Sequence, residues 1–416
     1  MAEHSTSKLN ALMKEVYADK LENLIPETAR LQRDIKYKSS AKEGKVYVQP
    51  MQVTRPAGWT LNTEGTAFEL NEAVPSESRD ARINGSSFVL EDLISYDAAA
   101  RVVKGKAAFV DGTSWMLENM AETASFILES QLLHGQDNVG VVDDQEDDSG
   151  TTQTFSFTAG TFIAALVSGL EGTYVEFYEP DGTPLTPTTA QIVGVSVEDL
   201  TITFEGVEAE LDAVAAAAAT GAHMYLRNTF DHGMVGLMKQ AGNVSDDLFG
   251  IDPTEFSLLA GNNHTAGGAL TFATMMKAVT KPTNRGLRED VTAYVSPPSW
   301  TDAMNDLSAL RRFAGKAGGS LEQGSDELMF HSQNGAIRIV PHLLMKPSEA
   351  LVLPVKKCIR LGASEPTFRL PGTDVGRYWD RIDGHAGYGT RCYWNQAVLL
   401  VTPNKACKIS GIVNQA

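Results

Sequence analysis

The clearest periodic pattern in the chain is a stripe of apolar side chains between positions 106 and 134, spaced mostly four residues apart. Glu118, Glu122 and Glu129 lie largely off this stripe, and Gly135 follows at the position of a left-handed C-cap. The pattern predicts an amphipathic helix that spans roughly 40 Å at about 1.5 Å per residue. Such a helix can serve as the spine on which other parts are built. The stripe consists of Phe109, Met116, Met120, Ala124, Leu128 and Leu132.

A second helical pattern lies near the N-terminus, ahead of any recognisable domain. Leu9, Leu12 and Val16 belong to an apolar stripe that begins after a possible capping residue, Ser7, and ends before Pro26. We expect an amphipathic N-terminal arm over residues 1–44. Its apolar face can cover the chain's own core, a neighbouring subunit or an accessory protein, and the sequence leaves these three partners open.

Residues 45–103 change from helical spacing to alternation interrupted by proline and glycine. The alternation predicts a long two-stranded excursion that leaves the chain and returns just before the spine helix, residues 104–136. Trp59 and Phe68 lie near its expected tip. Because an isolated hairpin is only marginally stable in water, we expect this excursion to lie on another surface.

Residues 137–228 alternate Thr, Val, Phe and Tyr with turn residues, which predicts a small antiparallel β domain inserted after the spine helix. The acidic run at 143–148 lacks the ligand spacing of a calcium loop, so we expect solvated surface. Residues 229–355 show a mixed helix and strand pattern, and residues 356–416 are rich in strands. The overall prediction is an α+β chain with an inserted β domain.

Charge divides the chain unevenly. Residues 137–228 hold sixteen acidic residues against one basic residue, Arg227, which gives them −15 of the chain's net −17. Residues 1–60 hold ten basic against seven acidic residues, a surplus of +3. Two surfaces of the protein are therefore expected to face different surroundings.

Motifs for chemistry are missing from the sequence. It contains no phosphate loop, nucleophile elbow, HExxH, paired cysteines or dinucleotide turn in a strand-to-helix context. His223 and His232 have no nucleophile or metal-ligand spacing beside them. We expect no catalytic, cofactor or metal site. Cys358, Cys392 and Cys407 fit buried thiols, and neither a signal pattern nor a long apolar run predicts a membrane segment.

The order of these parts resembles that of tailed-bacteriophage major capsid proteins with the Hong-Kong-97-type fold. The stretches that carry the resemblance are the excursion, the helix ending ESQLLHG, the run VTAYVSPPSWTDAMNDLSALRRF and the closing RCYWNQAVLLVTPNKACKISGI. The resemblance implies that 229–355 is an axial α/β domain, and that 356–416 returns to the peripheral domain of the spine helix. It covers nearly the whole chain.

The resemblance implies a structural protein that assembles with itself, as pentamers and hexamers, into an icosahedral shell around double-stranded DNA. It also implies a scaffolding protein, a portal and accessory cement proteins as partners, with assembly in the host cytoplasm and no membrane. Some family members crosslink through a lysine in the excursion, but residues 46–103 contain none. Shell strength is therefore expected to come from non-covalent contacts, at which Leu9, Leu12, Val16, Trp59 and Phe68 are candidate subunit-interface residues.

Two other function classes remain open from the sequence. An encapsulin-like compartment would share the fold but enclose a protein cargo, so the contents of the particle distinguish it from a virus. An adhesin or carbohydrate-binding protein would use the inserted domain as its working part. Gel filtration distinguishes this last possibility from a shell-forming protein, because a binding protein should run as a monomer or a small oligomer.

The arm generates the first prediction. Burying its stripe contributes on the order of 1.5–3 kcal/mol per large side chain before ordering costs, whereas attraction through its basic surplus is screened over roughly 10 Å at 0.1 M salt. Replacing Leu12 and Val16 with aspartate should therefore impair assembly more than neutralising Lys36 and Lys38, as measured by particle yield in sedimentation. Normal shells from the aspartate variant and failed shells from the charge variant would reverse this ranking.

Overall fold

The computed structural model of the protein describes residues 29–38, 46–62, 65, 67–97, 112–185, 190–306, 328–332, 335–369, 379–381 and 386–415. By internal contacts the chain forms two units. Among the described residues, the smaller unit contains parts of Val89–Ser125 and Pro366–Tyr393, and the larger contains Thr28–Phe88, Phe126–Glu365 and Trp394–Ala416. The predicted N-terminal helix, with Leu9, Leu12 and Val16, lies outside the described residues.

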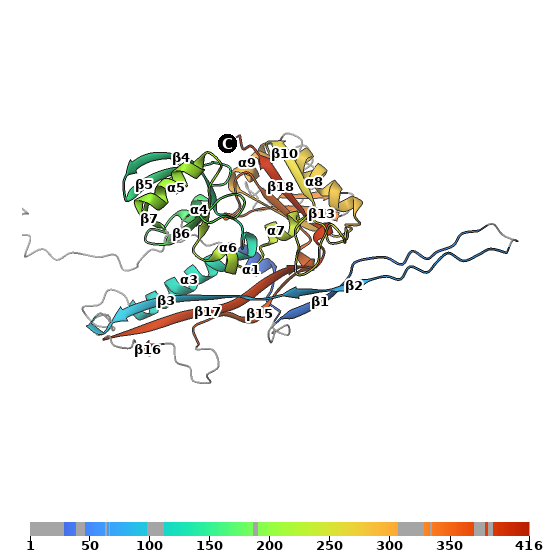
Figure 1. The fold of residues 1–416 in the computed structure, drawn as a ribbon, viewed down its shortest axis with the longest axis horizontal. Helices are drawn as coiled ribbons and strands as arrows, with labels where there is room; N and C mark the ends of the chain where they lie inside the picture. Colours follow the sequence, from blue (N-terminus) through green and yellow to red (C-terminus); the bar gives the residue numbers. More distant parts are fainter. Residues whose placement is uncertain are drawn as a thin grey trace, which may run out of the picture. The chain divides into compact units, whose positions relative to one another are not determined.

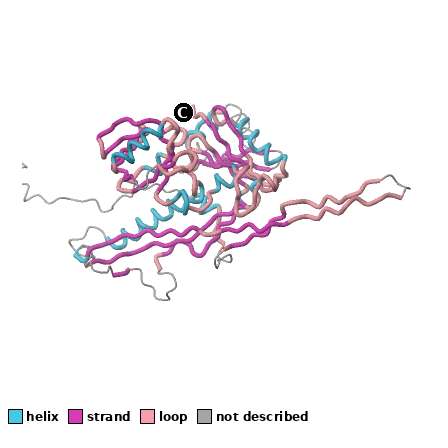
Figure 2. Tube along the Cα trace, viewed as in Figure 1, coloured by secondary structure: helices cyan, strands magenta, loops and turns pink. Residues whose placement is uncertain are grey.

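The excursion is an antiparallel hairpin. Strand β1 (Tyr47–Gln52) pairs with β2 (Ser78–Ile83), and the two arms continue side by side beyond the strands, as Figure 2 shows. The amide N–H of Ala57 donates to the carbonyl of Val74 at 3.1 Å. At the base of the hairpin, Ala81 and Ile83 are buried in a small apolar cluster with Leu361 and Leu399.

Strand β3 (Ser86–Ser95) follows the hairpin and pairs with β17 (Gly387–Leu400), in a sheet that also contains β15 (Cys358–Thr367) and β16 (Asp380–Arg381). Within the smaller unit, Glu91 and Arg391 form an ion pair across β3 and β17 at 2.8 Å. Within the larger unit, the rings of Phe88 and Trp394 stack at 4.9 Å between centroids. Polar and aromatic pairs of this kind hold the register of neighbouring strands.

The predicted spine helix is observed as α3 (Gly112–Leu133), and its expected residues 106–111 lie outside the described part. Met116, Met120, Ala124, Leu128 and Leu132 are all buried, as the stripe predicts. Gly135 has φ of +59°, so the expected left-handed cap is confirmed. Glu129, which lies largely off the stripe, is nevertheless 0% exposed, because the last turns of α3 are buried on every side.

Residues after α3 form a closed six-stranded barrel in the order β4–β5–β8–β7–β6–β9 (Figure 1). Phenyl rings fill its interior: the ring centroids of Phe177 and Phe204 lie 5.3 Å apart, and those of Phe155 and Phe204 lie 6.0 Å apart. The acidic run at 143–148 lies on a strand, with its carboxylates exposed. The strands are β4 (Gly140–Ser149), β5 (Thr152–Phe157), β6 (Tyr174–Tyr178), β7 (Ala190–Ser196), β8 (Thr201–Glu205) and β9 (His223–Leu226).

Three short or medium helices accompany the barrel. Helix α4 (Ala164–Val167) follows β5, and α5 (Glu208–Ala218) includes most of the alanine run at 213–219. Helix α6 (Thr229–His232) begins after β9. Leu211 and Val214 of α5 are buried in the same apolar cluster as the barrel interior, so α5 is part of the barrel's packing.

The next part of the chain builds a mixed six-stranded sheet in the order β10–β18–β14–β11–β13–β12. Helices α8 (Phe272–Asn284) and α9 (Pro297–Asn305) pack on one face, and α7 (Leu237–Gly242) lies on the other. Strands β11 and β14 in the middle of the sheet are buried on both faces, whereas β10 at one edge has no buried residue. Its strands are β10 (Asn263–Gly268), β11 (Val291–Val295), β12 (Leu328–Ser332), β13 (Gly335–Pro341), β14 (Ala350–Leu353) and β18 (Cys407–Ile412).

Strand β18 departs from the sequence expectation. Residues 356–416 were grouped as strands returning to the peripheral domain, but β18 lies inside the six-stranded sheet, parallel to β10 and antiparallel to β14. Its short alternating pattern, with Cys407 and Ile409 buried, shows that one face is covered but does not show which sheet supplies the neighbours. The three cysteines are buried and free, as expected.

Candidate functional site

The short segment 29–38 is held among elements distant in sequence. It contains α1 (Arg30–Asp34), a helix of one turn that the sequence analysis did not predict. Leu31 and Ile35 are fully buried in the main apolar cluster of the larger unit. Ala29, at the N-cap position, has no side-chain oxygen to accept the first helical N–H groups. The missing cap therefore has to come from elsewhere in the fold.

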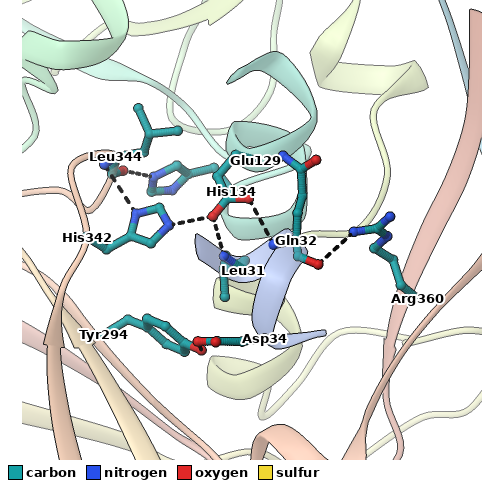
Figure 3. A network of polar contacts seen from close by, with 9 residues as sticks. All are labelled: Leu31, Gln32, Asp34, Glu129, His134, Tyr294, His342, Leu344 and Arg360. Atoms are coloured by element: carbon teal, nitrogen blue, oxygen red, sulfur yellow. Dashed lines mark hydrogen bonds and ion pairs between the residues drawn. The ribbon is translucent and has the colours of Figure 1, made fainter. Parts of the chain in front are cut away.

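Glu129 of α3 supplies that cap. Its carboxylate accepts hydrogen bonds from the backbone N–H groups of Leu31 and Gln32, the second at 3.1 Å, and from His342 Nε2 at 3.0 Å (Figure 3). A carboxylate is only an acceptor when ionised, and all three partners are donors. The positive end of the α1 backbone dipole also favours negative charge at this position. The arrangement explains how a glutamate can be fully buried here.

Two histidines extend the network. The amide N–H of Leu344 donates to His342 Nδ1 at 3.2 Å, which assigns the imidazole proton to Nε2, the nitrogen that faces Glu129. His134 Nε2 lies 2.6 Å from the carbonyl oxygen of Leu344 and donates to it. Burial, with the charge of Lys346 as the next cause, lowers the pKa of His134 to about 4. His134 is therefore neutral at pH 7.

A second set of contacts fixes the rest of the segment. The Tyr294 hydroxyl donates to Asp34 at 2.7 Å, and burial together with the Asp34 charge raises the pKa of that phenol. Arg360 Nη1 donates to the carbonyl of Gln32 at 3.3 Å. Beyond α1, the Tyr37 hydroxyl donates to the carbonyl of Gly362 at 2.6 Å. These partners come from β11 and β15, so residues 29–38 join α3, the six-stranded sheet and β15.

A separate polar contact lies at the base of the barrel. Nζ of buried Lys346 lies 3.4 Å from the Asp137 carboxylate and donates to the Asn138 side chain at 3.0 Å. Burial alone would raise the pKa of Asp137, but the charges of Lys346 and Lys408 hold it at about 2. A cleft of about 600 Å³ lies beside this contact, lined by Asp137, Glu349 and Lys408 among others.

Two glycines allow the backbone that enters the barrel and the backbone that leaves it to pass in direct contact. A Cβ on Gly135 would lie 2.0 Å from the carbonyl oxygen of Met234, and one on Gly236 would lie 2.3 Å from that of His134. Only glycine fits at such distances. The entry and exit of the barrel are therefore in direct backbone contact, and the barrel's interior cluster continues into the core around Leu132 and Leu133.

Of the candidate interface residues of the sequence analysis, the two that the structure describes, Trp59 and Phe68, take no part in the Glu129 network. Leu9, Leu12 and Val16 lie outside the described residues, while Trp59 and Phe68 lie on the hairpin and are 69% and 54% exposed. Their role in subunit contacts stays a prediction. The sequence analysis missed Glu129, His342 and Tyr294. The only local signal was the polar triplet Glu-Ser-Gln at 129–131, inside an otherwise apolar run.

The described residues contain no group of three or more His, Cys, Asp or Glu side chains placed to hold a metal ion. No helix in the described part is long and apolar enough to cross a membrane. The barrel interior is packed with phenyl rings, so the described barrel encloses side chains in place of a ligand.

No protein-family profile and no curated protein matches the sequence. Solved structures of capsids do match over nearly the full length. The chain is similar to the capsid subunit of Cyanophage A-1(L), with 12% identity, a TM-score of 0.56 and coverage of 98% of this chain and 99% of that one.

Two further matches agree. The capsid of the native GTA particle aligns with 9% identity and a TM-score of 0.51, covering 99% of this chain and 100% of that chain. The capsid of Cyanophage P-SCSP1u aligns with 11% identity and a TM-score of 0.50, covering 99% and 96%. At such identities the likeness establishes a shared fold: the chain has the mixed α+β fold of phage capsid subunits.

His134 generates a prediction on pH. Its pKa of about 4 in the folded protein lies below the 6.5 of an exposed histidine, so the folded state binds fewer protons than the unfolded state between these values. Its contribution to stability is present above pH 6.5 and is lost as the pH falls toward 4. Between pH 7 and pH 5 the loss should be about 2 kcal/mol.

The test compares chemical unfolding of wild type and His134→Gln at pH 7 and pH 5. Glutamine can still donate to the Leu344 carbonyl but does not titrate. His223 and His264 also have lowered pKa values through burial, so the difference between the two proteins isolates His134. An equal loss of stability in both proteins on acidification would contradict the assignment.

Proposed function

We propose that this chain is the major capsid protein of a tailed bacteriophage, with the Hong-Kong-97-type fold, and that it self-assembles into the icosahedral shell that encloses double-stranded DNA. The observation that carries the proposal is the full-length likeness to capsid subunits, with both chains covered almost completely. A likeness confined to the sheet or to the barrel would fit many functions. A likeness that includes the extended hairpin and α3 points to the shell.

The exposed apolar surface supports the same function. The arms of the hairpin carry Trp59, Leu61, Phe68 and Leu70, each more than half exposed, with no apolar core of their own. Large exposed apolar side chains gathered on one element mark an interaction site. We assign this excursion, residues 45–103, to contact with a neighbouring copy, since identical subunits in a closed shell satisfy such surfaces by repeated contacts.

The parts of the fold take the following roles in the proposal. Residues 1–44 are the arm, and 104–136 with β15, β16 and β17 form the peripheral domain. Residues 229–355, with β18, form the axial domain around which pentamers and hexamers meet. The barrel of 137–228 faces outward, because its charge of −15 would be repelled by packaged DNA and is compatible with solvent.

Partners follow from the same assignment. We propose a separate scaffolding protein and a portal during assembly in the host cytoplasm, and cement proteins on the finished virion. Contact with DNA is non-specific and electrostatic, through the mildly basic N-terminal region. The role is structural, and we assign no catalytic residue, cofactor or metal to it.

The test is to express the chain with its neighbouring structural genes and to examine particles by electron microscopy and sedimentation. Closed icosahedral shells that contain nucleic acid after packaging support the proposal. Shells of the same fold that enclose a specific protein cargo would indicate an encapsulin-like compartment. A chain that remains a monomer or small oligomer under all these conditions would overturn the shell function.

The excursion generates a prediction on shell stability. If Trp59 and Phe68 are fully buried at a subunit contact, replacing each with alanine should cost roughly 3–5 kcal/mol per site. Shells of the double variant should therefore dissociate at lower temperature and lower denaturant concentration than wild type. The control replaces Tyr174 and Val193, two exposed apolar residues of the barrel, with alanine. Equal resistance to heat and denaturant in the Trp59 and Phe68 variant and in the control would contradict the interface assignment.

A further inference from the structure

Residues 29–38 depend on contacts from outside the segment for their structure. A helix of one turn is unstable by itself, because nucleation costs more than one turn of hydrogen bonds returns. Here the cap comes from Glu129, the side chain of Asp34 is held by Tyr294, and the backbone of Gln32 is held by Arg360. Each of these partners belongs to an element that the segment meets only in the folded state.

The elements that carry these partners keep their own backbone hydrogen bonds without residues 29–38. Strand β11, which carries Tyr294, is paired with β13 on one side and β14 on the other. Glu129 lies within the continuous helix α3, and Arg360 lies on β15, which is paired with β17. Departure of residues 29–38 would therefore leave the strand pairing and the helix hydrogen bonds of these elements in place.

We propose that residues 29–38 form a latch, which opens and closes while the rest of the described core stays folded, and that the Glu129 carboxylate holds it closed. Closing brings two backbone N–H donors to the carboxylate, beside the donor from His342, and buries Leu31 and Ile35. Opening returns the carboxylate to water, where it needs no such partners. The closed state is therefore selected by charge and hydrogen bonding at a single side chain, and this makes it separable from the remaining fold.

The place of the latch in the sequence gives it a consequence for the proposed function. It lies inside the N-terminal arm, residues 1–44, after the apolar stripe that ends before Pro26 and ahead of the excursion. The stripe and the excursion are the segments that carry the candidate contacts with other copies. A closed latch fixes the core end of the arm at Ala29, where the described segment starts. Opening would release that end. This step rests on the proposed function, whereas the latch itself does not.

The test is amide hydrogen exchange of the full chain as the unassembled subunit, with wild type compared with Glu129→Gln. Glutamine has the same shape as glutamate, but its NH₂ group replaces one carboxylate oxygen. That NH₂ group then faces at least one of the three N–H donors, with which it cannot form a hydrogen bond. His342 cannot relieve this conflict, because its Nδ1 already accepts from Leu344. We expect exchange at 31–35 to accelerate by roughly tenfold or more, while β11 and β14 keep wild-type protection. The matched control is Glu118→Gln, an exposed glutamate of the same helix, which should leave exchange at 31–35 unchanged.

Two results would overturn the latch. Unchanged exchange at 31–35 in Glu129→Gln would show that the carboxylate does not hold the segment. Acceleration at 31–35 together with β11 and β14 would show that the segment opens only with the whole fold. If Glu129→Gln does not fold, Tyr294→Phe serves instead: it removes only the bond to Asp34, and selective acceleration at 31–35 is again the supporting result. Because the measurement uses unassembled chains, its outcome does not depend on whether shells form.

Discussion

The buried carboxylate of Glu129 is the constraint on which the centre of the larger unit depends. A charge without solvent is tolerated only where donors surround it, and this one has two backbone N–H groups and an imidazole N–H. The donors come from two places in the chain: the N-terminal segment supplies two and the loop after β13 supplies one. The N-terminal segment is therefore stable at this point only because the spine helix and the loop after β13 place the carboxylate and the imidazole there.

The same constraint explains which parts of the fold were predictable. Periodicity identified the buried stripe of α3 and its Gly135 cap, and alternation identified the β character of 137–228, because each of these signals is local. Glu129 lies largely off the stripe, where a glutamate is normally solvated. Its burial is set by Leu31 and His342, which are 98 and 213 residues away in sequence, and no local pattern records such partners.

The strand order of the sheets could not be predicted from the sequence, for a related reason. The sequence predicted a small antiparallel β domain, but closure into a barrel depends on pairing β9 with both β4 and β6, between strands far apart in the chain. The position of β18 between β10 and β14 was missed in the same way. The interface candidates Trp59 and Phe68 could be named from the sequence because large apolar residues in a proline-rich excursion have no core to enter. Their exposure in the single chain agrees with that reasoning.

The central claim is that this chain completes the burial of its apolar surface only within a shell. The most direct measurement is a high-resolution electron-microscopy reconstruction of assembled particles, in which the surroundings of the hairpin can be read residue by residue. The account predicts pentamers and hexamers in which Trp59 and Phe68, exposed in the single chain, are covered by a neighbouring copy. A closed shell in which both side chains remain in solvent would contradict it.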